Sequence, residues 1–104
     1  MTQQLKILLG QLNSIGDCLY ATTIARQIKL DFPGCHLTWA IASHCRQVIR
    51  NNPDVDDVWE IPAPNKKEER KFWNKFEAEA KKKLAEGEFD KVFFTQIFPN
   101  NIQN

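Results

Sequence analysis

The feature that most constrains the fold of this chain is the alternation of short apolar runs with longer segments of helical periodicity. Continuous or alternating apolar residues predict strands, whereas apolar residues three and four positions apart predict helices. Strands are expected over residues 5–10, 36–42, 55–61 and 91–94. Helices are expected over residues 15–32, 43–52 and 66–86, with Ser43 capping the second and Gly87 ending the third.

This order of elements predicts an α/β fold, a Rossmann-like three-layer α/β/α sandwich with a parallel sheet of about four strands. Right-handed crossovers make such strands parallel and place the helices on the sheet faces. We expect the domain to occupy residues 1–94 and residues 95–104 to form a polar tail. Because doubly wound sheets usually continue past four strands, we also expect the chain to be a truncated form or an excised half of a larger protein.

The net charge and the cysteine content indicate which partners and which cellular compartment to expect. The 104 residues carry a net charge of +1, which gives no reason to expect nucleic acid as a partner. The N-terminus lacks the basic and apolar stretches of a signal peptide, and no apolar run is long enough to span a membrane. With the three cysteines Cys18, Cys35 and Cys45, this predicts a cytoplasmic protein whose thiols stay reduced.

The loop after the first strand is the expected ligand site, because open parallel sheets bind ligands beyond the carboxyl ends of their strands. It runs from Gly10 to Asp17. The spacing of Gly10 and Gly16 matches neither dinucleotide-binding nor P-loop patterns, and no lysine follows. Two interpretations remain open. Ser14 and Asp17 form a loose capping box at a helix start, or Asp17 is a catalytic carboxylate at the mouth of the sheet.

An ordered series of motifs supports the second interpretation. They are KILL (6–9), LNSIGD (12–17), TTI (22–24), FPG (32–34), LTW (37–39), NPDVDDV (52–58) and FDKV (89–92). In this order they resemble the N-terminal region of the lipopolysaccharide heptosyltransferases of glycosyltransferase family 9, and the resemblance extends to about residue 94. Gln11, the Cys18-Leu19-Tyr20 run and the segment 95–100 depart from the family pattern.

The resemblance implies the acceptor-side, N-terminal half of an inverting GT-B glycosyltransferase. Asp17 then corresponds to the aspartate of the family's S-[IM]-G-D motif, the proposed catalytic base. We expect Asn13, Ser14 and Gly16 to bind the acceptor, since Gly16 allows close approach to the backbone. A missing C-terminal domain would bind the nucleotide-sugar donor, for which ADP-heptose is the candidate. The acceptor would be a lipid-linked or lipopolysaccharide-type glycan, and neither metal nor cofactor is expected.

Other features allow further interpretations. Cys35-His36 and His44-Cys45 match no zinc spacing, and a strand rising about 3.3 Å per residue would separate them by about 20 Å. His44 could line the cleft. The lysine-rich helix of residues 66–86 is expected to pack on the sheet, with peripheral contact to the inner membrane as an added role. The alternative function is a non-catalytic small-ligand module in which Ser14 and Asp17 only cap a helix.

Overall fold

The computed structural model describes residues 4–62 and 69–95. The strands are β1 (Lys6–Gly10), β2 (His36–Ala42), β3 (Asp57–Ile61) and β4 (Lys91–Phe94). Between them lie α1 (Ile15–Asp31), the 3-10 helix η1 (Ser43–Ile49) and α2 (Glu69–Ala85). The predicted order of elements is therefore confirmed. The predicted helix start at residue 66 and the polar tail beyond residue 95 lie outside the described residues.

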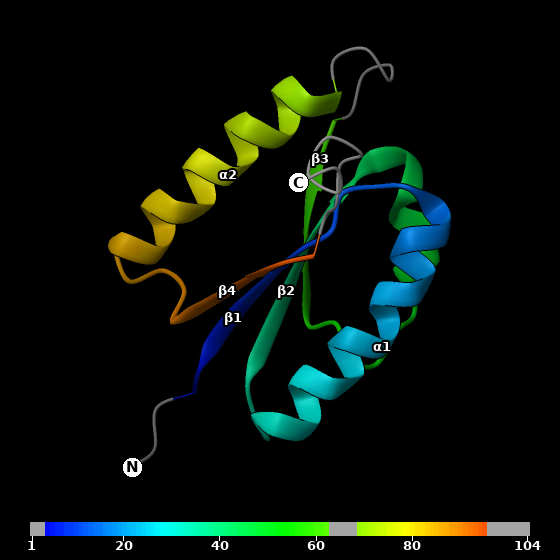
Figure 1. Cartoon of the computed structure of the whole chain (residues 1–104). Coiled ribbons are helices and arrows are strands. Elements are labelled where there is room, and N and C mark those ends of the chain that lie inside the picture. The colour runs from blue at the N-terminus through cyan, green and yellow to red at the C-terminus, as the bar shows by residue number, and fades with distance from the viewer. Residues whose placement is uncertain (1–3, 63–68, 96–104) are drawn as a thin grey trace, which may run out of the picture.

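The four strands form one parallel sheet in the order β3-β2-β1-β4 (Figure 1). β1 pairs with β2 in the register Leu9↔Trp39 and with β4 in the register Leu9↔Phe93. The chain first moves outward from β1 to β3 and then returns to place β4 on the other side of β1. The strand order thus reverses between β1 and β4, and ligands bind at such a switch point in doubly wound sheets.

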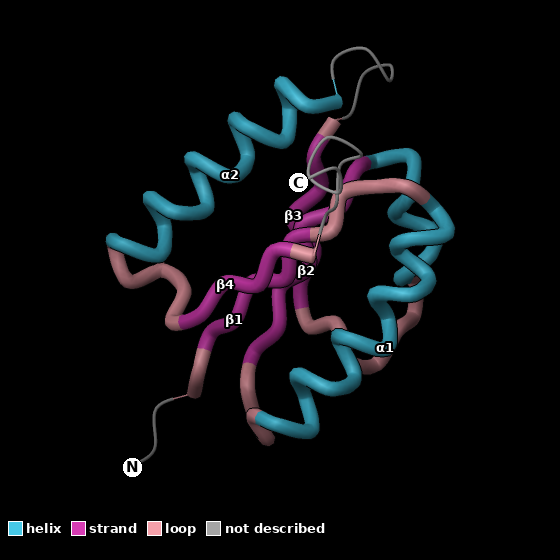
Figure 2. Tube along the Cα trace, in the orientation of Figure 1, coloured by secondary structure: helices cyan, strands magenta, loops and turns pink. Residues whose placement is uncertain are grey.

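Helices cover both faces of the sheet, which gives the predicted three layers (Figure 2). On one face, α1 and η1 enclose a core that includes Ile7, Leu9 and Trp39. On the other face, α2 packs Trp73, Phe76 and Ala80 onto Leu8 and its neighbours. Successive β1 residues contribute to opposite cores because strand side chains alternate between the two faces.

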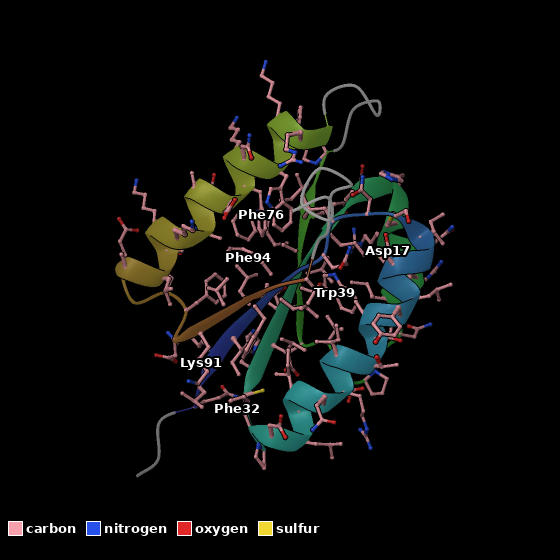
Figure 3. All side chains as sticks on the ribbon, in the orientation of Figure 1. Asp17, Phe32, Trp39, Phe76, Lys91 and Phe94 are labelled. Atoms are coloured by element: carbon pink, nitrogen blue, oxygen red, sulfur yellow. The ribbon has the colours of Figure 1, made fainter. Side chains whose placement is uncertain are left out.

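Gly10 allows α2 to approach the sheet closely at the end of β1. A Cβ atom at this position would lie 2.9 Å from Cε2 of Phe76 and 3.0 Å from Cδ1 of Phe94. The rings of Phe76 and Phe94 meet edge to face at 5.9 Å, and Trp73 contacts both (Figure 3). This aromatic cluster fixes α2 over β1 and β4 next to the loop that follows Gly10.

At the amino end of the sheet, two aspartates each fasten one strand to its neighbour. Asp56 donates its backbone N–H to the Leu37 carbonyl at 2.9 Å, and its Oδ2 accepts the Leu37 N–H at 2.8 Å. Asp90 makes the same pair of bonds with Lys6, at 2.7 and 2.9 Å. Both aspartates immediately precede a strand, so each carboxylate satisfies an N–H at the start of the adjacent strand.

Three local expectations were wrong. Ser43 is the first residue of η1 rather than its cap, because Ala42 holds the N-cap position and makes no side-chain cap bond. Leu84 follows Phe72, Phe76 and Ala80 at four-residue spacing, which predicts a place on the same apolar stripe, but Leu84 is 40% exposed, one residue from the end of α2. The apolar run Val92-Phe93-Phe94 predicts a buried strand, but β4 is the outermost of the described strands on its side of the sheet and Phe93 is 36% exposed.

The end of α2 confirms the predicted role of Gly87. Gly87 adopts a left-handed conformation with φ of 84°. Its N–H donates to the Leu84 carbonyl, and the Glu88 N–H donates to the Lys83 carbonyl, at 3.2 and 2.9 Å. This pair of bonds is a Schellman motif, which satisfies carbonyls left free at a helix end.

Candidate functional site

The candidate site lies at the carboxyl end of β1, where the chain leaves the sheet next to the end of β4. The Thr95 N–H donates to the Gly10 carbonyl at 3.1 Å, which extends the pairing of the two strands by one residue. Residues 11–14 then cross from the sheet to the first turn of α1. This loop therefore occupies the switch point of the sheet, as the sequence predicted.

Gln11 holds the loop together from inside. It is 3% exposed, and its Nε2 donates to the Asn13 carbonyl at 2.7 Å. Its Oε1 accepts the Thr95 hydroxyl at 2.6 Å, and its backbone carbonyl accepts the Trp39 indole N–H at 2.9 Å. One side chain and its backbone thus join β2, the end of β4 and the loop after β1.

The next two residues bring the chain to the helix. The Leu12 carbonyl accepts the Ala42 N–H at 2.9 Å, which ties the loop to the carboxyl end of β2. Asn13 is 9% exposed, and the peptide bond between Asn13 and Ser14 is cis. Asn13 therefore lies mostly below the surface, whereas Ser14, Gly16 and Asp17 are exposed.

Ser14 occupies the N-cap position of α1, but its hydroxyl caps no backbone N–H. The hydroxyl instead donates to Oδ2 of Asp17 at 3.3 Å. The capping box therefore lacks the expected bond from the Ser14 hydroxyl to a backbone N–H of the helix. The expected place of Asp17 in the first helical turn is confirmed. The exposed Asp17 carboxylate lies at the helix start, at the end of the molecule opposite Phe32 and Lys91 (Figure 3).

In the first two turns of α1, which also hold Gly16 and Asp17, three apolar side chains are exposed: Ile15, Leu19 and Tyr20, together called the apolar collar. Their exposed fractions are 44%, 56% and 72%. A Cβ atom at Gly16 would meet no heavy atom of the described residues within 4 Å, so the space above Gly16 is open. The apolar collar was not predicted from the sequence, although Leu19 and Tyr20 belong to the run that departs from the family pattern.

Cys18 follows Asp17 but points into the core, where it is fully buried. Burial, reinforced by the neighbouring Cys45 thiol, raises the pKa of Cys18 well above its usual range. Burial also raises the pKa of Cys35. Thiolates are the nucleophilic and metal-binding form of cysteine, so these thiols act as small core residues, as expected for Cys18.

The two Cys-His pairs do not come together in the structure. All three cysteines are buried, whereas His44 is exposed on η1. Within residues 4–62 and 69–95, no three potential ligands among His, Cys, Asp and Glu are grouped to hold a metal ion. In the same part of the chain, no helix is long and apolar enough to cross a membrane.

Comparison with known proteins defines the fold class. No family model matches the sequence, and no curated protein matches it. The structure is similar to the crystal structure of a family 9 glycosyl transferase from Veillonella parvula DSM 2008, with a TM-score of 0.57 and 23% identity. The match covers 78% of this chain and 24% of the other chain. The chain therefore has the α/β fold found in part of a GT-B-like protein, and it spans about a quarter of that neighbour's length.

Proposed function

We propose that this chain is the acceptor-binding half of an inverting GT-B glycosyltransferase. The observation that carries the proposal is the position of Asp17, an exposed carboxylate at the switch point of a β3-β2-β1-β4 sheet. The fold shared with a family 9 glycosyl transferase supports the same conclusion. In the complete enzyme, a second domain would bind a nucleotide-sugar and face this end of the sheet.

Asp17 acts in this proposal as the general base. Its carboxylate takes the proton of an acceptor hydroxyl while that oxygen attacks the anomeric carbon of the donor sugar. The nucleotide diphosphate leaves from the opposite side, so the configuration inverts. The Ser14 hydroxyl donates to Oδ2 of Asp17 and orients the carboxylate. Oδ1 then remains available to accept the acceptor hydroxyl.

The apolar collar gives the acceptor a surface to rest on. Sugar rings present apolar C–H faces as well as hydroxyls, and Tyr20 supplies a largely exposed aromatic ring one helical turn after Asp17. The open space above Gly16 admits the ring next to the carboxylate. We assign acceptor binding to Ser14 and Gly16, and Asn13 supports the loop from beneath.

The substrates we propose are those of a heptosyltransferase-like enzyme: a nucleotide-sugar such as ADP-heptose and a lipopolysaccharide-type glycan. A lipid-linked acceptor would bring the protein to the cytoplasmic side of the inner membrane. The outer face of α2 could assist there, because it carries the exposed lysines Lys71, Lys75, Lys81 and Lys82. Basic residues on a helix favour anionic lipid surfaces.

The alternative is a non-catalytic small-ligand module in which Ser14 and Asp17 only cap α1. The absence of a side-chain cap bond from Ser14 weakens this alternative. The two proposals differ in what the carboxylate of Asp17 contributes: a proton acceptor in one, and helix stability in the other.

The deciding experiment measures glycosyl transfer from a nucleotide-sugar by the complete two-domain protein. Asp17→Asn is expected to lower kcat by about 10²- to 10⁴-fold, the usual contribution of a positioned base. Asp31→Asn is the matched control, because Asp31 ends the same helix and, within the described residues, accepts only a surface bond from Gln27. A kcat for Asp17→Asn equal to that of the control would contradict the catalytic role.

A further inference from the structure

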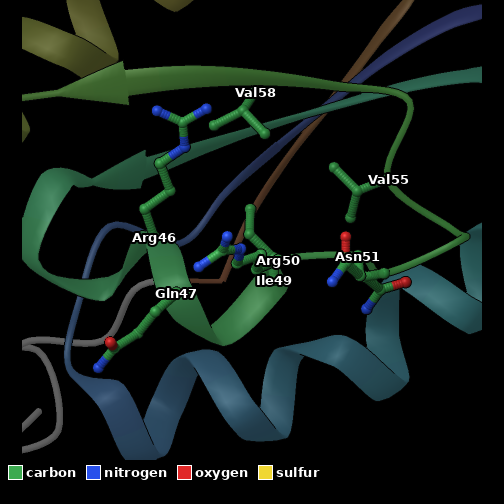
Figure 4. A pocket seen from close by; sticks show the side chains of 8 residues that line it. Arg46, Gln47, Ile49, Arg50, Asn51, Val55 and Val58 are labelled. Atoms are coloured by element: carbon green, nitrogen blue, oxygen red, sulfur yellow. The ribbon is translucent and has the colours of Figure 1, made fainter.

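A concave site apart from the Asp17 loop lies beside β3, on the face of the sheet that carries α1 and η1. The cavity has a volume of about 600 Å³, which lies in the range of small-molecule sites. It opens between η1 with its following turn and the chain entering β3 (Figure 4). Its lining contains no Asp or Glu; the residues are Arg46, Gln47, Ile49, Arg50, Asn51, Asn52, Val55 and Val58.

Arg50 is the central cation of this cavity. Among residues 4–62 and 69–95, its guanidinium makes no ion pair and no hydrogen bond. Arg46, one turn earlier, pairs with Glu60 through Nη1 at 2.6 Å and keeps its other guanidinium N–H groups as further donors. The cavity therefore holds an excess of positive charge that no residue lining it offsets.

Polar amides accompany the arginines. The side chains of Gln47 and Asn51 are exposed, and each amide offers both a donor and an acceptor. Asn51 has a positive φ of 63°, a conformation that asparagine tolerates better than most residues. Asn52 uses its Oδ1 to accept the Asp54 N–H at 2.8 Å, which leaves its NH₂ group as a donor.

The adjoining cavity is a weaker candidate for a ligand site than the cavity beside β3. It shares Arg50 and Asn52 with the first cavity and has a volume of about 520 Å³. Its cation Arg26 is neutralised by Asp54 at 3.2 Å. Its Thr22 and Thr23 hydroxyls donate within α1, to the carbonyls of Leu19 and Tyr20. Arg50 lines both cavities, but among the described residues the other polar side chains without partners, Gln47 and Asn51, line only the cavity beside β3.

We propose that this cavity binds a phosphorylated sugar. Arginine guanidinium groups match the geometry of phosphate oxygens, so Arg50 and Arg46 hold the phosphate. The amides of Gln47, Asn51 and Asn52 can donate to and accept from sugar hydroxyls. Ile49, Val55 and Val58 provide an apolar floor for the ring. The site is separate from Asp17 and does not depend on the proposed transferase activity.

The test is an NMR titration of the ¹⁵N-labelled chain with glucose 6-phosphate, glucose and inorganic phosphate. Glucose 6-phosphate is expected to shift the amide signals of residues 46–52 saturably, and to bind at least about tenfold more tightly than either part alone. Arg50→Gln is expected to weaken binding by about tenfold or more, because it removes a charged hydrogen-bond donor. Lys82→Gln removes the same charge from α2, on the other face, and is expected to leave the affinity unchanged.

Several results would overturn the proposal. They are equal affinities of the Arg50→Gln and Lys82→Gln chains, shifts centred outside the cavity, and no saturable binding by the wild-type chain. Equal affinity for inorganic phosphate and glucose 6-phosphate would overturn the assignment of a sugar. Arg50→Lys provides a second test should Arg50→Gln unfold: it keeps the charge but loses the planar fork, and binding is expected to weaken severalfold.

Discussion

At the amino end of the sheet, Asp56 and Asp90 bind the backbone N–H groups of neighbouring strands. At the carboxyl end, by contrast, the exposed carboxylate of Asp17 accepts only the Ser14 hydroxyl, at 3.3 Å, among the residues that the structure describes. All three aspartates belong to the motifs that resemble family 9 glycosyltransferases. The first two have a structural task that accounts for them fully. Asp17 contributes little to the structure, and this difference is the reason to assign it a chemical role.

The two ends also differ in how their polar groups are satisfied. The carboxyl end depends on one buried side chain, Gln11, which joins the loop to β2 and to Thr95 at the end of β4. At the amino end, the bonds are spread over the first residues of the strands. Lys29 adds an ion pair there, since its Nζ lies 2.5 Å from Asp56 Oδ2. A rigid loop beneath an exposed carboxylate is what a catalytic site requires, because reacting groups must be held in position.

The largest change expected from breaking the carboxyl end comes from Trp39→Ala. Trp39 is fully buried, and its indole N–H donates to the Gln11 carbonyl. Truncating a buried Trp costs about 3 to 5 kcal/mol in unfolding free energy, which is much of the stability of a small domain. Urea denaturation followed by circular dichroism measures the loss. Trp39→Phe, which keeps a ring, should lose clearly less; equal losses would show that ring packing contributes little.

Breaking the amino end at Asp56 should have a smaller but still large effect. Asp56→Ala leaves the Leu37 N–H without its side-chain acceptor and Lys29 without its ion-pair partner. A hydrogen bond to a charged group contributes about 1.5 to 3 kcal/mol, and partial exposure of the carboxylate places the loss near the lower value. Asp57→Ala is a matched neighbour, since the Asp57 carboxylate accepts only the Val58 N–H. Equal losses in the two variants would contradict the bracing role of Asp56.

Acid should weaken the amino end selectively. Burial opposes ionisation of Asp56, but the Leu37 N–H and Lys29 outweigh it and hold the pKa of the carboxyl below its ordinary value of 3.8. The stabilisation is therefore complete above the unfolded-state pKa and is lost as the pH falls through the lower folded-state pKa. The difference in unfolding free energy between wild type and Asp56→Asn should shrink below about pH 3.9. A difference that stays constant with pH would contradict this origin.

Much of the fold follows from the sequence because local patterns determine it. The apolar run of β1 and the Gly87 stop of α2 each predict their element without reference to the rest of the chain. The exposure of Phe93 was not predictable in the same way. A strand at the border of a sheet has the same apolar residues as a central one, and only the strand order reveals its position.

The sequence predicts which loop forms the candidate site, but not which contacts hold that loop in place. Asp17 and Ser14 are neighbours in sequence, so their proximity could be expected. Gln11 looked like an ordinary loop residue, because its partner Thr95 lies 84 positions away. The cavity around Arg50 likewise depends on Val58 of β3 facing the turn after η1. Contacts between distant segments carry no signal in a single sequence.

The most direct test of the account compares the unfolding free energies of Asp17→Asn and Asp56→Asn in urea. We predict a change within about 0.5 kcal/mol for Asp17→Asn, as for a surface substitution, because the amide oxygen of asparagine can still accept the long bond from the Ser14 hydroxyl. Asp56→Asn should lose at least about 1 kcal/mol, because it removes the charge that holds Leu37 and Lys29. A loss at Asp17 equal to or greater than that at Asp56 would contradict the account, since it would make the Asp17 carboxylate a structural cap.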